Sequence, residues 1–146
     1  MDFEGRLIKP DASGLWLVEI PALDVMTQGK SRKDALYMIK DAVLELLKVH
    51  YTGKLGRGFR LFVDEYEEDV IGIRATDNRF LFALALRRQR EKHGSTIRDA
   101  AKRLNARSPN GYAQYEQARV LPSLQRYEAL LVAANPMVSR PRLHFG

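Results

Sequence analysis

The sequence predicts an α+β protein with two domains, a β-β-β-α-β-β domain at residues 1–75 and an all-helical domain at residues 76–146. Apolar and polar residues alternate in five segments of the first half, as they do in half-buried strands. After residue 76 the apolar residues recur at helical spacings of three and four. The charge changes at the same place, because residues 1–75 carry 11 Lys or Arg and 13 Asp or Glu, whereas residues 76–146 carry 13 and 5.

The first domain is expected to be an antiparallel sheet with one helix. Turn signals at KPDASG and PALD separate the first three strands, and the acidic run EED separates the last two, which predicts a meander and a hairpin. Between them, apolar residues recur at helical spacing from Ser31 to His50, and Ser31 with Asp34 fits a helix N-cap. This helix should lay its apolar stripe on the sheet and end at TGKLGRG. The expected strands are 3–9, 14–20, 25–29, 59–66 and 69–76.

The second domain is expected to contain four short helices. Gly94 is a suitable residue to end the first, and Thr96 or the serine before it can cap the second. Ser108 should cap the third, with Pro109 at the first helical position, where a missing N–H does no harm. An Asn-Pro pair stops the fourth. The expected ranges are 77–94, 95–104, 108–118 and 122–134.

The residue pattern contains no catalytic arrangement, so we expect a protein that is not an enzyme and that needs no cofactor or metal. The three histidines lack ligand-like spacing, and GKLGRG lacks the G-x-x-x-x-G-K-[ST] order of a phosphate cradle. Carboxylates are scattered except in DEYEED, which is best explained as a solvated hairpin tip. A sheet with one helix is nevertheless like a truncated ribonuclease H fold, which catalyses with clustered carboxylates and divalent metal, so a metal nuclease stays as a distant third alternative.

Composition also bears on location and on partners. The chain has no cysteine, no apolar run near the roughly 20 residues that span a bilayer, and no apolar region at its start. We therefore expect a cytoplasmic protein with no membrane partner. The basic second half suggests a polyanionic partner, because Lys and Arg that neutralise phosphates release condensed counterions.

The segment LRRQREKHGSTIRDAAKRLNARSPNGYAQYEQARVLPSLQRYEALLVAA resembles the helix-turn-helix domain of the phage repressor and Cro family. An LR..RE..G helix precedes a helix with matching apolar positions at Ile97, Ala101 and Leu104. Glu116 and Arg119 then stand before Pro-Ser-Leu at the family spacing. The resemblance implies that the third helix of this domain reads the major groove of DNA.

The segment departs from that family at three positions. Thr96 replaces the Gln that is common near the start of the second helix. The turn position usually held by Gly carries Ala106, and Arg107 follows where a small aliphatic residue is usual. These departures leave the expected fold unchanged and bear on individual DNA contacts.

The third helix of the second domain should present a polar side to DNA. Tyr112 and Tyr115 share the side expected to be buried, whereas Asn110, Gly111 and Gln114 fall on the other side. Amide side chains there can pair with adenine, and glycine permits close approach. Four further side chains, at the helix starts and just beyond the third helix, are expected to meet phosphates. The candidate DNA-binding residues are Thr96, Arg107, Ser108, Asn110, Gly111, Gln114 and Arg119.

The first half resembles the amino-terminal domain of HicB antitoxins. GLWLVEIPAL, then TQG, then SRKDALYMIKDAVLELL follow the order of that family's pattern, with Asp34-Ala35 where Glu-Ala is usual and without the usual Pro-Gly. The resemblance implies binding and neutralisation of a HicA-like toxin, a small ribonuclease that cleaves messenger RNA. It also implies repression of the protein's own operon through the second domain.

The preferred interpretation is therefore an antitoxin and autorepressor that acts as a homodimer or higher oligomer, because operators are read as paired half-sites. Its expected partners are its operator DNA, a HicA-like toxin and itself. The alternative is a helix-turn-helix regulator whose first domain binds a ligand or dimerises.

Overall fold

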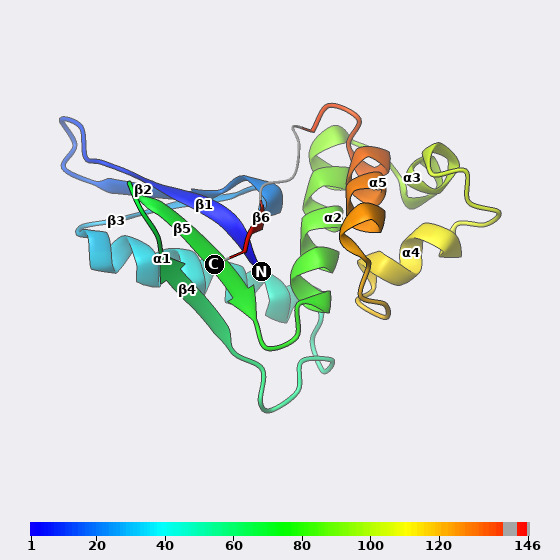
Figure 1. Cartoon of the computed structure of the whole chain (residues 1–146), viewed down its shortest axis with the longest axis horizontal. Helices are drawn as coiled ribbons and strands as arrows, with labels where there is room; N and C mark the ends of the chain where they lie inside the picture. Colours follow the sequence, from blue (N-terminus) through cyan, green and yellow to red (C-terminus); the bar gives the residue numbers. More distant parts are fainter. Residues whose placement is uncertain (139–142, 146) are drawn as a thin grey trace. The chain divides into compact units, whose positions relative to one another are not determined.

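Residues 1–138 and 143–145 are described in this computed structural model, and they form two units (Figure 1). The first unit contains Met1–Thr76 together with a strand near the carboxyl end, and the second begins at Asp77. An antiparallel sheet in the first unit is followed by helices in the second, which confirms the predicted α+β class.

The first unit is built on an antiparallel sheet with the order β3-β2-β1-β5-β4. Val18 of β2 faces both Leu7 of β1 and Thr27 of β3, and Phe3 of β1 faces Ile73 of β5, so one face of the sheet carries the apolar residues. The predicted order of five strands and one helix is confirmed. The strands are β1 (Asp2–Ile8), β2 (Trp16–Ile20), β3 (Val25–Gly29), β4 (Leu61–Glu65) and β5 (Val70–Ala75), with a short 3-10 turn at Pro21–Leu23.

Helix α1 (Arg32–His50) covers one face of this sheet and packs against β2, β3 and β4. Its start is fixed as the sequence predicted, because the Ser31 hydroxyl accepts a hydrogen bond from the Asp34 N–H at 3.0 Å. A Cβ at Gly29 would lie 2.3 Å from the backbone nitrogen of Ala35, so glycine lets the helix begin against β3. The buried stripe of α1 consists of Ala35, Ile39, Val43 and Leu47.

The acidic run lies at the β4–β5 hairpin, as predicted, but it is only partly solvated. Glu67 and Glu68 are exposed. Arg32 at the start of α1 binds Glu65 at 2.9 Å and also binds Asp69, so two carboxylates of the hairpin pair with a cation of the helix. The run therefore forms surface ion pairs between the hairpin and the start of α1.

The end of the chain corrects one prediction, because the sequence assigned the whole basic tail to the second domain. Leu143 and His144 instead form β6, which pairs with Phe3 and Asp2 of β1. The pairing of β2 with β1 runs along Arg6–Ile8, which leaves the first residues of β1 open on that edge. The ring of His144 also stacks on Tyr66 with 3.7 Å between centroids.

The second unit contains four helices among its described residues, as predicted: α2 (Arg79–His93), α3 (Ile97–Arg103), α4 (Asn110–Glu116) and α5 (Leu124–Ala134). Helices α2 and α3 each pack against both α4 and α5 (Figure 1). In the core the ring of Phe82 meets Tyr127 edge to face at 4.6 Å. Gly94, with φ of 76°, ends α2 as expected.

Candidate nucleic-acid interface

The turn between α3 and α4 closes through backbone hydrogen bonds. The N–H of Ala106 bonds to the carbonyl of Ala101 at 3.0 Å, and the N–H of Asn105 bonds to Lys102 at 3.1 Å. Asn105 takes the left-handed conformation with φ of 59°, a conformation that Asn tolerates better than most residues. The sequence comparison assigned the usual glycine position to Ala106, and that assignment is wrong by one residue.

The N-cap of helix α4 is one residue later than the sequence predicted, at Pro109 instead of Ser108. Pro109 is the N-cap, and no side chain caps the helix, so Ser108 does not have the predicted role. Instead, the carbonyl of Ser108 accepts the N–H of Gly111 at 3.1 Å, which makes a tight first turn. The hydroxyl of Ser108 is exposed at the entrance to α4.

Gly111 faces the preceding turn. A Cβ at this position would lie 2.7 Å from the Cβ of Ala106, closer than two such atoms can approach. The sequence analysis predicted that Gly111 allows DNA to approach α4 closely. In the structure, the α3–α4 turn folds back on the first turn of α4, and this contact leaves no room for a side chain at Gly111. This residue therefore shapes the α3–α4 connection.

The outward side of α4 carries polar side chains. Asn110 and Gln114 are four residues apart, which places them on one side of the helix, away from buried Tyr112 and Glu116; Asn110 is exposed and Gln114 is half-buried. Arg107 is exposed before α4 and Arg119 is exposed after it. Within the described part of the chain, Arg107, Asn110, Gln114 and Arg119 make no side-chain hydrogen bond or ion pair. Their donors and acceptors are available to a ligand.

Thr96 is exposed at the start of α3, but its groups are already engaged. The Thr96 hydroxyl accepts the Asp99 N–H at 3.0 Å, and the Asp99 carboxylate accepts the Thr96 N–H at 2.9 Å. These hydrogen bonds hold the pKa of Asp99 below its ordinary value of 3.8. The capping box thus engages the N–H groups of Thr96 and Asp99, and of the polar groups of Thr96 only the hydroxyl proton remains to donate.

Tyr112 is buried as predicted, but Tyr115 is only half-buried. The guanidinium of Arg126, on α5, lies over the ring of Tyr115 at 5.7 Å from its centroid. Sequence spacing did not single out Arg126, because it lies beyond the resembling Pro-Ser-Leu segment and meets Tyr115 only in the folded unit. It adds a cation close to α4.

The elements α3 and α4, their turn, and the helices that support them define the class of this unit as a helix-turn-helix. Residues 81–135 match the family model of a helix-turn-helix domain, which suggests a DNA-binding regulator. No curated protein and no solved structure matched the chain.

The remaining chemistry of the described residues is limited. No group of three or more His, Asp or Glu residues in this part of the chain could hold a metal ion. None of the described helices is long and apolar enough to cross a membrane. The surface around α4 presents amide and guanidinium groups, which are the kinds of group that contact base edges and phosphates in protein–DNA complexes.

Proposed function

We propose that this protein is a transcriptional repressor that reads its operator with α4. The observation that carries the proposal is the pair of amides on the side of α4 opposite buried Tyr112, the exposed Asn110 and the half-buried Gln114. Amides of this kind form paired hydrogen bonds with adenine in the major groove. Arg107, Ser108 and Arg119 flank the pair, where they contact phosphates and fix the position of α4 on the duplex.

The protein further acts as the antitoxin of a type II toxin-antitoxin system. Its first unit binds and neutralises a HicA-like ribonuclease, and its second unit represses the shared operon. The likeness of the first half to HicB antitoxins supports this role, and so does the division of charge, because a net −2 half and a net +8 half suit two different macromolecular partners. The protein works in the cytoplasm as a homodimer and is not itself an enzyme.

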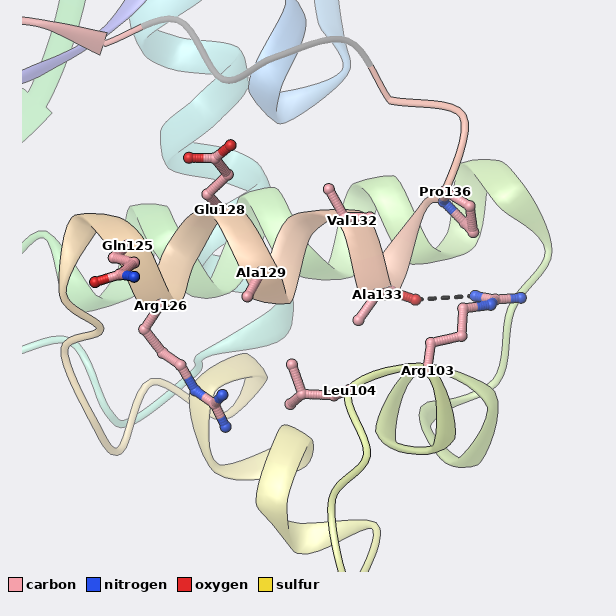
Figure 2. A pocket seen from close by; sticks show the side chains of 9 residues that line it. All are labelled: Arg103, Leu104, Gln125, Arg126, Glu128, Ala129, Val132, Ala133 and Pro136. Atoms are coloured by element: carbon pink, nitrogen blue, oxygen red, sulfur yellow. Dashed lines mark hydrogen bonds between the residues drawn. The ribbon is translucent and has the colours of Figure 1, made fainter.

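One observation favours a second candidate function, a regulator whose first unit binds a small molecule. A cavity of about 610 Å³ lies in the first unit. It is separate from a cavity of about 650 Å³ in the second unit (Figure 2). The cavity of the first unit is lined by polar residues that include Glu4, Arg6, Tyr66 and His144. In this alternative, the first unit would bind a small molecule in this cavity instead of a toxin, and the bound molecule would regulate the protein.

Co-expression with the product of the neighbouring gene separates the two candidates. The antitoxin role predicts that the two proteins co-purify and that expression of this chain restores growth to cells that express the toxin. If the two proteins do not co-purify and growth is not restored, the small-molecule regulator is the better explanation. Metal-dependent RNA cleavage by the purified chain alone would instead revive the nuclease alternative.

A further inference from the structure

The loop between α1 and β4, residues 51–60, concentrates positive charge on a unit that is otherwise acidic (Figure 1). Its sequence, YTGKLGRGFR, contains 3 Lys or Arg and no Asp or Glu. The other residues of 1–75 contain 8 Lys or Arg and 13 Asp or Glu, a net charge of −5. We call residues 51–60 the basic loop.

Two turns give the basic loop a defined shape. The N–H of Lys54 donates to the carbonyl of Tyr51 at 3.0 Å, and the N–H of Phe59 donates to the carbonyl of Gly56 at 3.0 Å. The Tyr51 side chain is buried, so the start of the loop is held by the core of the unit. Arg57 therefore lies in the middle of the second turn.

The groups around Arg57 are open to a ligand. Lys54 and Arg57 are exposed, and within the described part of the chain neither side chain makes a hydrogen bond or an ion pair. The backbone N–H groups of Gly56, Arg57 and Gly58 likewise have no acceptor among the described residues. A Cβ at Gly56 or Gly58 would meet nothing within 4 Å, so both sides of Arg57 are clear. Ammonium, guanidinium and backbone N–H groups are the donors with which proteins hold phosphates.

The charge density of duplex DNA suits this loop. The duplex carries one negative charge per about 1.7 Å of its axis, so two cations close together on a loop can each neutralise a phosphate. A single strand carries about half that density and releases fewer counterions for each contact. The proposed reading of an operator by α4 also brings duplex DNA to this chain.

We propose that the basic loop binds the phosphate backbone of duplex DNA, so that the first unit adds a contact of its own to the DNA that α4 reads. The inference rests on the proposed function, because that DNA is the operator of a repressor. Lys54 and Arg57 neutralise phosphates and read no base, so the contact raises affinity for operator and random DNA alike.

Fluorescence anisotropy of the full chain on a random-sequence DNA duplex, measured at several salt concentrations, tests the proposal. The loop variant is Lys54→Ala with Arg57→Ala. Lys33→Ala with Lys40→Ala is the matched control, because it removes the same charge from exposed positions on α1 of the same unit. Arg57→Lys changes the shape of the side chain and keeps its charge. All of these residues are exposed, so circular dichroism should show an unchanged fold.

The loop variant should lower the salt slope by about two units and weaken binding about tenfold at low salt, because two fewer counterions are released. The control and Arg57→Lys should keep the wild-type slope. A loop variant that binds like the wild type, or a control that loses as much as the loop variant, would overturn the proposal. A loss of affinity confined to single-stranded RNA would overturn it too, because RNA would then be the partner of the loop.

The operator separates this proposal from the proposed function. If only the loop contact is wrong, the wild type and the loop variant bind the operator equally tightly, and both prefer it to random DNA. If the wild type binds no duplex, the reading of DNA by α4 and the loop contact are both overturned.

Discussion

The guanidinium of Arg90 and the carboxylate of Glu116 form a two-pronged ion pair that joins α2 to the end of α4. Nη2 of Arg90 lies 2.6 Å from Oε1 of Glu116, and Nε lies 2.9 Å from Oε2. The side chains are 13% and 3% exposed, and the Glu116 carboxylate raises the pKa of Arg90. A third donor of Arg90 holds the carbonyl of Ser95 at 3.0 Å. The pair thus fixes α4 against the helices that support it.

Removing one partner of this pair should destabilise the second unit strongly. Glu116→Ala leaves a guanidinium largely buried without its carboxylate, so the free energy of unfolding should fall by about 3–5 kcal/mol. Helical circular dichroism reports the loss. The single tryptophan, Trp16, lies on β2 in the first unit, so its fluorescence should report a nearly unchanged transition there.

The double variant Arg90→Met with Glu116→Leu serves as the control for this prediction. Replacing both charges with apolar side chains removes the unpaired charge, so the double variant should be more stable than Glu116→Ala. If Glu116→Ala costs less than about 1 kcal/mol, the pair does not hold α4 in the way described.

Gly111→Ala should destabilise the α3–α4 turn by about 1–3 kcal/mol, because the new methyl group would overlap the Cβ of Ala106. Adding Ala106→Gly removes that Cβ and should restore part of the loss. Gly58→Ala is a matched control, since a Cβ there meets nothing within 4 Å. Chemical denaturation followed by circular dichroism measures all three. Equal stability of Gly111→Ala and the wild type would refute the assigned contact.

The capping of α3 predicts a pH dependence. Because the pKa of Asp99 is lowered in the folded chain, its stabilisation is present above the ordinary value of 3.8 and is lost as the pH falls through the folded pKa. The difference in unfolding free energy between the wild type and Asp99→Ala should therefore shrink as the pH falls below 3.8. Thr96→Ala should cost about 1 kcal/mol at neutral pH, whereas Thr96→Ser should keep the cap. A difference for Asp99→Ala that does not change with pH would contradict this account.

Local patterns predicted most of the fold, because strand alternation and helical spacing record which side of each element is buried. The cap at Ser31 followed from the same local chemistry, which for α3 left Ser95 and Thr96 as alternatives, of which Thr96 is the cap. What the sequence missed depends on contacts between distant residues. The pairing of His144 with Asp2 requires an open edge of β1, which no local pattern of the tail reveals.

The candidate site shows the same division between local and distant information. Spacing predicted that Gln114 lies opposite Tyr112, because both belong to one helix. Helical spacing placed Gly111 on the DNA side. Spacing alone takes no account of the α3–α4 turn, in which Ala106 lies against Gly111. Nor could it find the stacking of Arg126 on Tyr115, since these side chains come from different helices.

The most direct test of the central claim, that α4 reads base edges, is a fluorescence anisotropy titration of operator and random DNA at several salt concentrations. Gln114→Ala should lose roughly 1–3 kcal/mol on the operator and much less on random DNA, because a paired amide contact distinguishes bases. Arg119→Ala should weaken both DNAs alike and lower the salt slope by about one unit, since one fewer counterion is released. Gln125→Ala, an exposed glutamine on α5, should change neither. If Gln114→Ala weakens both DNAs equally or leaves binding unchanged, the claim that α4 reads the operator is contradicted.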